Sequence, residues 1–175
     1  MRKVYLDNAA TTQIRHEVIV KMQDALTLYY GNPSSVHSYG RTSKTAIEQA
    51  RKTIAKTLNA QPSEIIFTSG GTEADNMIIR SAIRDLGVKT LITSKIEHHA
   101  VLHTAEEMVR EYGIALHFVD LDKFGGPNLS HLEKLLQQDD SKKLVSLMHV
   151  NNEIGNLLDI DAVCSLCLEY NALLH

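Results

Sequence analysis

Beyond residue 63, short apolar segments of strand type alternate with segments of helical spacing, and this alternation restricts the fold more than any other feature. The predicted strands span 65–68, 90–93, 116–119 and 144–150, and the predicted helices span 72–86, 98–112, a short stretch from 130, and 161–170. Strands connected by helices in this way form right-handed crossovers and a mainly parallel sheet. The sequence therefore predicts an α/β fold in three layers, with helices on both faces of the sheet.

Three of these helices carry recognisable end signals. Gly87 and Gly113 follow the predicted helices at 72–86 and 98–112 and are expected to act as C-terminal caps. The short helix begins with the pattern of a capping box, from Ser130 to Glu133. These signals predict where each helix begins or ends.

The first 63 residues have a different pattern. They comprise an extended arm at 4–12 and two segments of helical spacing at 16–30 and 43–58. We therefore divide the chain into an N-terminal arm with two helices, residues 1–63, and the first half of a larger domain, residues 64–175. The last four residues have the pattern of a fifth strand, so we expect the sheet to continue in a longer protein.

The composition excludes several classes of protein. A chain of 175 residues with 43% hydrophobic content can build a buried core, and a net charge of −3 argues against a nucleic-acid-binding surface. No apolar segment is long enough to span a membrane, so we expect a cytosolic protein. Cys164 and Cys167 lie in a helical pattern, and we expect both to be reduced and buried.

The stretch from Ile65 to Glu73 predicts an anion site. An apolar strand breaks at Gly70 and Gly71, and a helix follows from Thr72. The unpaired N–H groups and the dipole of a helix N-terminus attract anions, and glycine lets the backbone approach a phosphate closely. Taken alone, an ordinary strand-to-helix turn with Thr72 as a cap explains the pattern better.

Polar residues at the ends of the other strands favour the anion site. The carboxyl ends of parallel strands lie along one edge of a sheet, where ligands bind. Gly70 to Thr72, Glu97 to His99 and Asn151 to Glu153 each follow a predicted strand. We therefore expect Thr72, His98 and Asn152 to share one cleft. Such a cleft suits a flat phosphorylated ring such as pyridoxal 5′-phosphate (PLP), and a phosphorylated metabolite fits it as well.

The histidines after the second strand allow two further interpretations. His99 and His103 are four residues apart, a spacing that a zinc site can use. No carboxylate or cysteine at ligand spacing completes a set, so no metal site is predicted. For His98, the alternative to a functional role is a solvent-facing residue at a helix start.

Five motifs resemble those of the cysteine desulfurases, and they occur in the family's order. They are Leu6 to Thr12, Gly31 to Ser35, Phe67 to Glu73, Ser94 to His98, and Met148 to Gly155. The resemblance implies the large domain of the fold-type I PLP enzymes. It also implies a homodimer that takes sulfur from L-cysteine, leaves L-alanine, and passes the sulfur as a persulfide to an acceptor such as an iron–sulfur scaffold protein.

The resemblance also implies roles for individual residues. Gly71 and Thr72 match the pair that binds the cofactor phosphate, His98 matches the histidine that stacks on the ring and helps to move protons, and Asn152 matches the asparagine beside the ring's phenolic oxygen.

Other family residues have no match. These are the Schiff-base lysine, the nucleophilic cysteine, the arginine for the substrate carboxylate, and the aspartate expected about two residues after His175. We therefore predict that this chain alone is inactive. Two alternatives stay open. One is another fold-type I PLP enzyme, such as a selenocysteine lyase or an aminotransferase, and the other is a non-catalytic fragment that acts as an interaction module.

Overall fold

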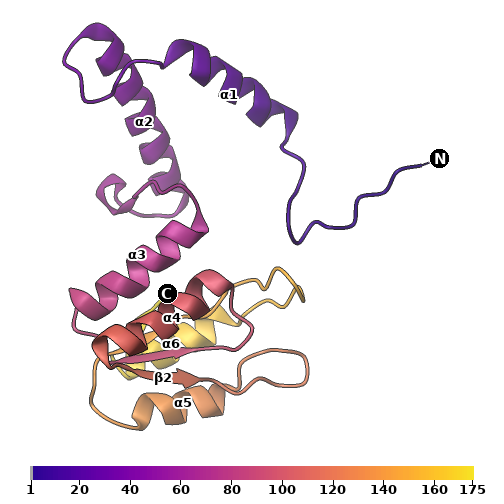
Figure 1. Cartoon of the computed structure of the whole chain (residues 1–175), viewed down its shortest axis with the longest axis vertical. Helices are drawn as coiled ribbons and strands as arrows, with labels where there is room; N and C mark the ends of the chain where they lie inside the picture. The colour runs from indigo at the N-terminus through magenta and orange to yellow at the C-terminus, as the bar shows by residue number, and fades with distance from the viewer. Residues whose placement is uncertain (1) are drawn as a thin grey trace. The chain divides into compact units, whose positions relative to one another are not determined.

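The computed structural model describes residues 2–175, which form two compact units that divide between Phe67 and Thr68. We refer to residues 1–67 as the N-terminal unit and to residues 68–175 as the C-terminal unit. Each unit has its own helices, coloured from indigo to magenta in the first and from magenta to yellow in the second (Figure 1). The domain boundary between residues 63 and 64 stays a prediction.

The N-terminal unit contains α1 (His16–Leu28), α2 (Ser38–Thr57) and the short 3₁₀ helix η1 (Pro62–Glu64). The helix predicted at 16–30 is confirmed to within two residues. The second helix begins five residues before the predicted position 43. Its N-cap is His37, whose ring Nδ1 accepts a hydrogen bond from the Gly40 N–H at 3.3 Å. Histidine is not among the preferred capping residues, so the sequence pattern did not reveal this start.

The strand predicted at 65–68 is wrong. These residues are not part of a strand, and within residues 2–175 they have no ladder partner. Their apolar character is present, but Ile66 is 65% exposed and Phe67 is 47% exposed. A strand is stabilised by hydrogen bonds to a neighbouring strand, and an apolar pattern does not supply that neighbour.

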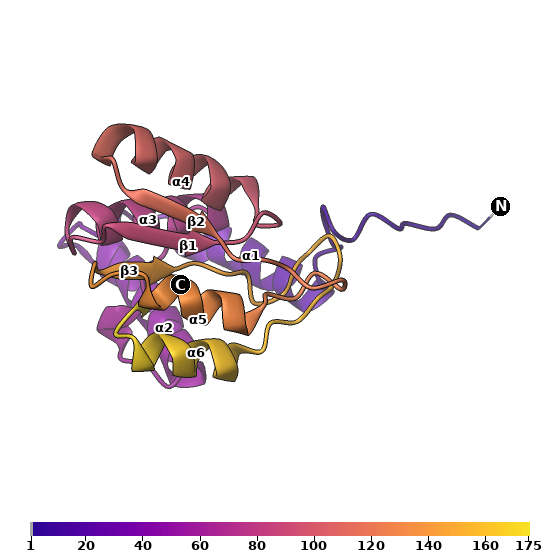
Figure 2. The same cartoon turned by 90° about the horizontal axis from the view of Figure 1, so that it is seen from below.

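The C-terminal unit is built on a parallel sheet of four strands in the order β2-β1-β3-β4. Figure 2 labels β2, β1 and β3, which lie in this order. The strands are β1 (Thr90–Thr93), β2 (Ala115–Phe118), β3 (Lys143–Val145) and β4 (Leu173–Leu174), and the helices are α3 (Gly71–Arg84), α4 (His99–Tyr112), α5 (Leu129–Gln137) and α6 (Ile160–Glu169). Leu91 of β1 aligns with Leu116 of β2 and with Leu144 of β3. The predicted fold class, an α/β fold with a parallel sheet, is confirmed.

The helices cover both faces of this sheet. One core contains residues of α3 and α4 together with Leu91 and Leu144, and the other contains residues of α5 and α6 together with Ile92 and Val145. Because successive side chains of a strand point to opposite faces, neighbouring residues of β1 and β3 enter different cores. Figure 2 shows α3 and α4 on one side of the sheet and α5 and α6 on the other.

One helix end agrees with the sequence prediction, and one helix start differs from it. Gly113 caps α4 in the left-handed conformation, as predicted, with φ 63°. The predicted capping box at Ser130 is wrong, because Asn128 is the N-cap of α5 and its side chain accepts the His131 N–H at 3.1 Å. Leu129 packs on the core, and α5 begins at this residue, one position before Ser130.

The strand predicted at 144–150 ends at Val145. Two further backbone hydrogen bonds, from Ser146 N to Ile92 O and from Leu147 N to His175 O, continue along the sheet before the chain turns away. The predicted fifth strand begins as β4 beside β3. Backbone pairing therefore continues through Leu147, two residues beyond β3.

The cysteines of α6 are both free. Cys167 lies in the core, and its burial raises the pKa of its thiol to about 11. Cys164 is half-buried. No helix within residues 2–175 is long and apolar enough to cross a membrane.

Candidate functional site

The loops that follow β1 and β3 carry two of the predicted site residues, His98 and Asn152. Both loops leave the carboxyl edge of the sheet, where ligands bind in folds of this type. His98 is the N-cap of α4, and its Nδ1 accepts the Ala100 N–H at 3.1 Å. A neutral His98 therefore carries its proton on Nε2.

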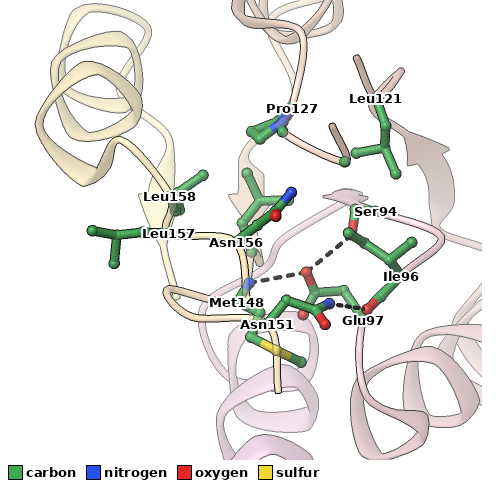
Figure 3. A pocket seen from close by; sticks show the side chains of 13 residues that line it. Ser94, Ile96, Glu97, Leu121, Pro127, Met148, Asn151, Asn156, Leu157 and Leu158 are labelled. Atoms are coloured by element: carbon green, nitrogen blue, oxygen red, sulfur yellow. Dashed lines mark hydrogen bonds between the residues drawn. The ribbon is translucent and has the colours of Figure 1, made fainter. Parts of the chain in front are cut away.

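Glu97 joins the two loops. Its Oε1 accepts a hydrogen bond from Ser94 Oγ at 3.0 Å and another from the Met148 N–H at 2.9 Å (Figure 3). Burial of this side chain raises the pKa of Glu97, the two hydrogen bonds lower it, and the negative charge of Asp75 raises it further. A buried carboxyl group directly before His98 thus ties the end of β1 to the end of β3.

Asn151 makes a second connection between the same loops. The side chain is buried, and its Nδ2 donates to the Ile96 carbonyl oxygen at 2.9 Å (Figure 3). Its Oδ1 accepts the N–H groups of Glu153 at 2.9 Å and Ile154 at 3.1 Å. The turn that carries Asn152 is therefore anchored to the segment that carries His98.

No individual role is predicted for Glu97 or Asn151 from the sequence. Both are among the polar residues at predicted strand ends, and each directly precedes a residue with a predicted role, His98 or Asn152. The missing signal was burial, because a buried polar side chain must find hydrogen-bond partners and here both find them across the two loops.

The N-terminus of α3 presents free backbone donors. Within residues 2–175, the N–H groups of Gly71 and Thr72 have no acceptor. The Ser69 N–H donates a hydrogen bond to Glu73 Oε2 at 2.6 Å, and this hydrogen bond lowers the pKa of Glu73. A Cβ atom built on Gly70 or Gly71 meets nothing within 4 Å, so the space beside the helix start is open. Free N–H groups with open space beside them are suited to an anion.

Thr72 and His98 line the same hollow, which has a volume of about 280 Å³. The other residues that line it are Asn76, His99, Ala100, His103, Thr104 and Glu107. Gly71 precedes Thr72 but does not line this hollow. Asn152 is exposed on its turn, where its Nδ2 donates to Glu153 Oε1 at 3.0 Å, and it does not line the hollow either. The structure thus brings together two of the four predicted site residues, Thr72 and His98.

His98 also lines a second hollow of about 280 Å³, which contains a partly buried polar network. The ring of His175 connects two elements there. Its Nδ1 is 3.0 Å from Ser146 Oγ, and its Nε2 is 3.7 Å from Asp75 Oδ1. Burial lowers the pKa of His175, and the charge of Asp75 opposes this effect. The network fixes His175 at the end of β4 close to the site.

The pocket of Figure 3 is too small for a ring-shaped cofactor. Its volume is about 30 Å³, and it is lined by Glu97, Asn151 and neighbouring loop residues. A space of this size holds one or two water molecules. Within residues 2–175, no group of three or more histidine, cysteine or acidic residues is arranged to hold a metal ion.

The comparison with protein families decides the family of the chain. Residues 4–175 match the aminotransferase class-V family. The chain belongs to this family. The resemblance that the five motifs indicated is therefore confirmed.

Named relatives of this class-V chain include cysteine desulfurases. It is 44% identical over 176 residues to "Cysteine desulfurase IscS" of Dictyoglomus turgidum, covering 99% of this chain and 44% of the relative. The corresponding protein of Methanosarcina thermophila is 42% identical over 177 residues, covering 99% of this chain and 43% of the relative. The chain thus spans less than half the length of these curated relatives.

Solved structures agree with this assignment. A NifS-like protein has a TM-score of 0.91 and 36% identity, with 99% of this chain and 48% of that protein covered. A second structure, "SspA in complex with cysteine", has a TM-score of 0.83 and 30% identity, with 95% of this chain and 48% of that protein covered.

The class-V family implies a PLP cofactor, and the described residues fit such a group. The free N–H groups and the Thr72 hydroxyl provide donors for a phosphate, while the His98 imidazole in the same hollow provides a flat surface for an aromatic ring. Donors and an imidazole in one hollow are the arrangement that a phosphorylated ring needs.

Proposed function

We propose that this chain is part of a PLP-dependent cysteine desulfurase, which converts L-cysteine to L-alanine and transfers the sulfur as a persulfide to an acceptor. The observation that carries the proposal is the hollow shared by Thr72 and His98. It joins an anion-binding helix start to an imidazole at the ligand edge of a parallel sheet. The names of the relatives support the choice of reaction.

Each of the four site residues has a role in this proposal. The Gly71 and Thr72 N–H groups and the Thr72 hydroxyl bind the phosphate. His98 stacks on the ring and exchanges a proton through Nε2, because its Nδ1 is engaged by the Ala100 N–H. Asn152 donates to the ring's phenolic oxygen from a turn that Asn151 anchors. Bound PLP supplies the electron sink for charge that develops on the substrate.

The remaining parts of the proposal concern the longer protein. It includes the lysine, cysteine, arginine and aspartate that this chain does not match, and it acts as a cytosolic homodimer that serves a sulfur acceptor such as an iron–sulfur scaffold protein. This chain alone is therefore expected to be inactive. One neighbouring structure, described as a complex with cysteine, supports cysteine as the substrate in preference to selenocysteine or an aminotransferase substrate.

The phosphate role can be tested with pyridoxine 5′-phosphate, which has no aldehyde and so does not react with lysines. We expect the chain to bind it in a fluorescence titration and to bind unphosphorylated pyridoxine much more weakly. Thr72→Val should weaken binding about tenfold or more, since a hydrogen bond to a charged group contributes about 1.5–3 kcal/mol. The matched control is Ser130→Ala, which removes a hydroxyl from the second residue of α5. Equal binding with and without the phosphate group would contradict the proposed site.

The catalytic part of the proposal has a separate test. Incubated with PLP and L-cysteine, the 175-residue chain should release no alanine above the level given by PLP without protein. A longer relative that contains the missing residues serves as the positive control. Alanine release by this chain alone would show that the lysine and cysteine are not needed, and the proposal of inactivity would fail.

A further inference from the structure

We propose that Glu73 is a positioning residue that holds the loop before α3 in the conformation that binds the cofactor phosphate. This inference rests on the proposed function, because it assigns a role to a side chain beside the phosphate donors. Glu73 follows Thr72 directly and is the third residue of α3. Its Oε2 accepts the Ser69 N–H at 2.6 Å, so the carboxylate reaches back past Gly70 and Gly71 to the residue before the helix cap.

The loop that Glu73 spans contains two consecutive glycines, Gly70 and Gly71. Glycine loses more conformational entropy on ordering than any other residue, so this loop is costly to fix in one conformation. Order that is present before a ligand arrives lowers the cost of binding. The Glu73 hydrogen bond provides such order from the helix side. A second hydrogen bond, from Thr68 Oγ1 to the Gly70 carbonyl oxygen at 3.1 Å, constrains the same loop from its other end.

The contact also leaves the donors proposed for the phosphate free. Glu73 engages the Ser69 N–H, whereas the N–H groups of Gly71 and Thr72 have no acceptor within residues 2–175. The hydrogen bond from Ser69 lowers the pKa of Glu73, so the side chain is a carboxylate at neutral pH. Its negative charge repels a nearby phosphate, and the geometry and the charge of Glu73 therefore act on phosphate binding in opposite directions.

Two substitutions separate the geometry from the charge. Glu73→Ala removes both the acceptor and the charge, and we expect it to bind pyridoxine 5′-phosphate about threefold to tenfold more weakly than the wild type, as for the loss of one hydrogen bond. Glu73→Gln keeps an acceptor oxygen and removes the repulsion, which offsets its weaker neutral hydrogen bond, so its affinity should stay within about twofold of the wild type. Binding of unphosphorylated pyridoxine should change in neither variant. Glu17→Ala, at an exposed position in the first turn of α1, is the matched control and should leave both affinities unchanged.

Fluorescence titration of the full chain with both ligands measures these affinities, and amide hydrogen exchange of Ser69 without ligand reports on the contact itself. We expect faster exchange of the Ser69 N–H in Glu73→Ala and restored protection in Glu73→Gln. Tighter phosphate binding by Glu73→Ala would overturn the inference, because it would show that the carboxylate competes with the phosphate for the loop. Equal weakening in the two variants, or an equal loss for the two ligands, would overturn it as well.

The wild type separates this inference from the proposed function. Equal binding of the two ligands by the wild type would contradict the phosphate site and, with it, the role of Glu73. If the wild type prefers the phosphorylated ligand and Glu73→Ala has the same preference, only the role of Glu73 is overturned. Circular dichroism verifies that each variant is folded.

Discussion

The two units of the chain differ sharply in how much apolar surface they bury. The C-terminal unit has two cores, one on each face of its sheet. Within residues 2–67, by contrast, only Gly40, Ser43 and Ala55 are buried, and α1 has no buried residue at all. Both units contain helices with apolar stripes. The difference is that a sheet provides a second layer, and an apolar stripe is buried only where another layer covers it.

Exposed apolar side chains on α1 illustrate this point. Val18, Ile19, Met22 and Leu26 are between 38% and 80% exposed. In the C-terminal unit, residues of the same type on α3 and α4, such as Ile79 and Met108, are almost completely buried. Composition alone therefore does not distinguish a helix that contributes to a core from one that does not.

The largest change in unfolding free energy is expected for a core substitution in the C-terminal unit. Leu91→Ala on β1 should lower the free energy of unfolding by about 2–5 kcal/mol, because Leu91 is completely buried and its loss leaves a cavity. The same substitution at Leu26 on α1, which is 80% exposed, should change it by less than about 0.5 kcal/mol. Urea denaturation of both variants measures the difference. Similar losses from the two substitutions would show that α1 also depends on buried apolar contacts.

A second test concerns the close backbone packing around Gly40 in the N-terminal unit. A Cβ atom on Gly40 would collide with the carbonyl oxygen of Ser35 and lie 2.6 Å from that of Asn32. Gly40→Ala should therefore destabilise the turn before α2 by about 1–3 kcal/mol. Amide hydrogen exchange of α2 would report this as faster exchange. Gly70→Ala is the control, since a Cβ there meets nothing within 4 Å, and unchanged exchange in the Gly40 variant would mean that this turn is not closely packed.

Within the C-terminal unit, adjacent asparagines provide a test of the polar contacts. Asn151→Ala removes one buried donor and one buried acceptor that together hold three hydrogen bonds, and it should cost about 1–3 kcal/mol in unfolding free energy. Asn152→Ala removes an exposed side chain and should cost less than about 0.5 kcal/mol. Thermal denaturation compares the two. A larger loss at Asn152 would contradict the assignment of the anchoring role to Asn151.

The smallest expected effect is the pH dependence that Glu97 contributes. Because its pKa is raised in the folded protein, the folded state holds the proton more tightly than the unfolded state. Its contribution to stability is fully present below the unfolded pKa and is lost as pH rises through the folded pKa. Glu97→Gln keeps an acceptor oxygen and removes this titration, so the stability of the wild type relative to the variant should fall as pH rises. A relative stability that increases with pH would contradict the raised pKa.

Much of the C-terminal unit could be predicted because its signals are local. The strand at 90–93 matches β1 residue for residue, and Gly113 ends α4 as expected. Periodic apolar residues predict these elements because each element buries one face against the sheet. The place of His98 at the start of α4 followed from the same pattern, since it lies where the helix after this strand is predicted to begin.

The errors arose where a structure depends on residues far away in sequence. The segment at 65–68 has the composition of a strand but no ladder partner within residues 2–175. The start of α5 depends on the packing of Leu129 as well as on Ser130. The first property is not encoded in the neighbouring residues, whereas Asn128, a preferred N-cap residue, is a local signal for the second.

By itself, the amino-acid sequence determined the α/β class, the parallel arrangement, the family resemblance and the position of polar residues at strand ends. These properties depend on local periodicity and on short motifs. Only the tertiary structure decided that Thr72 and His98 share a hollow that Asn152 does not line, that Glu97 and Asn151 connect two loops, and that the rings of His99 and His103 lie 5.1 Å apart. The reason is that a shared hollow and the hydrogen bonds between loops depend on how separate elements pack, while a ring spacing within one helix depends on side-chain conformation. A linear pattern specifies neither.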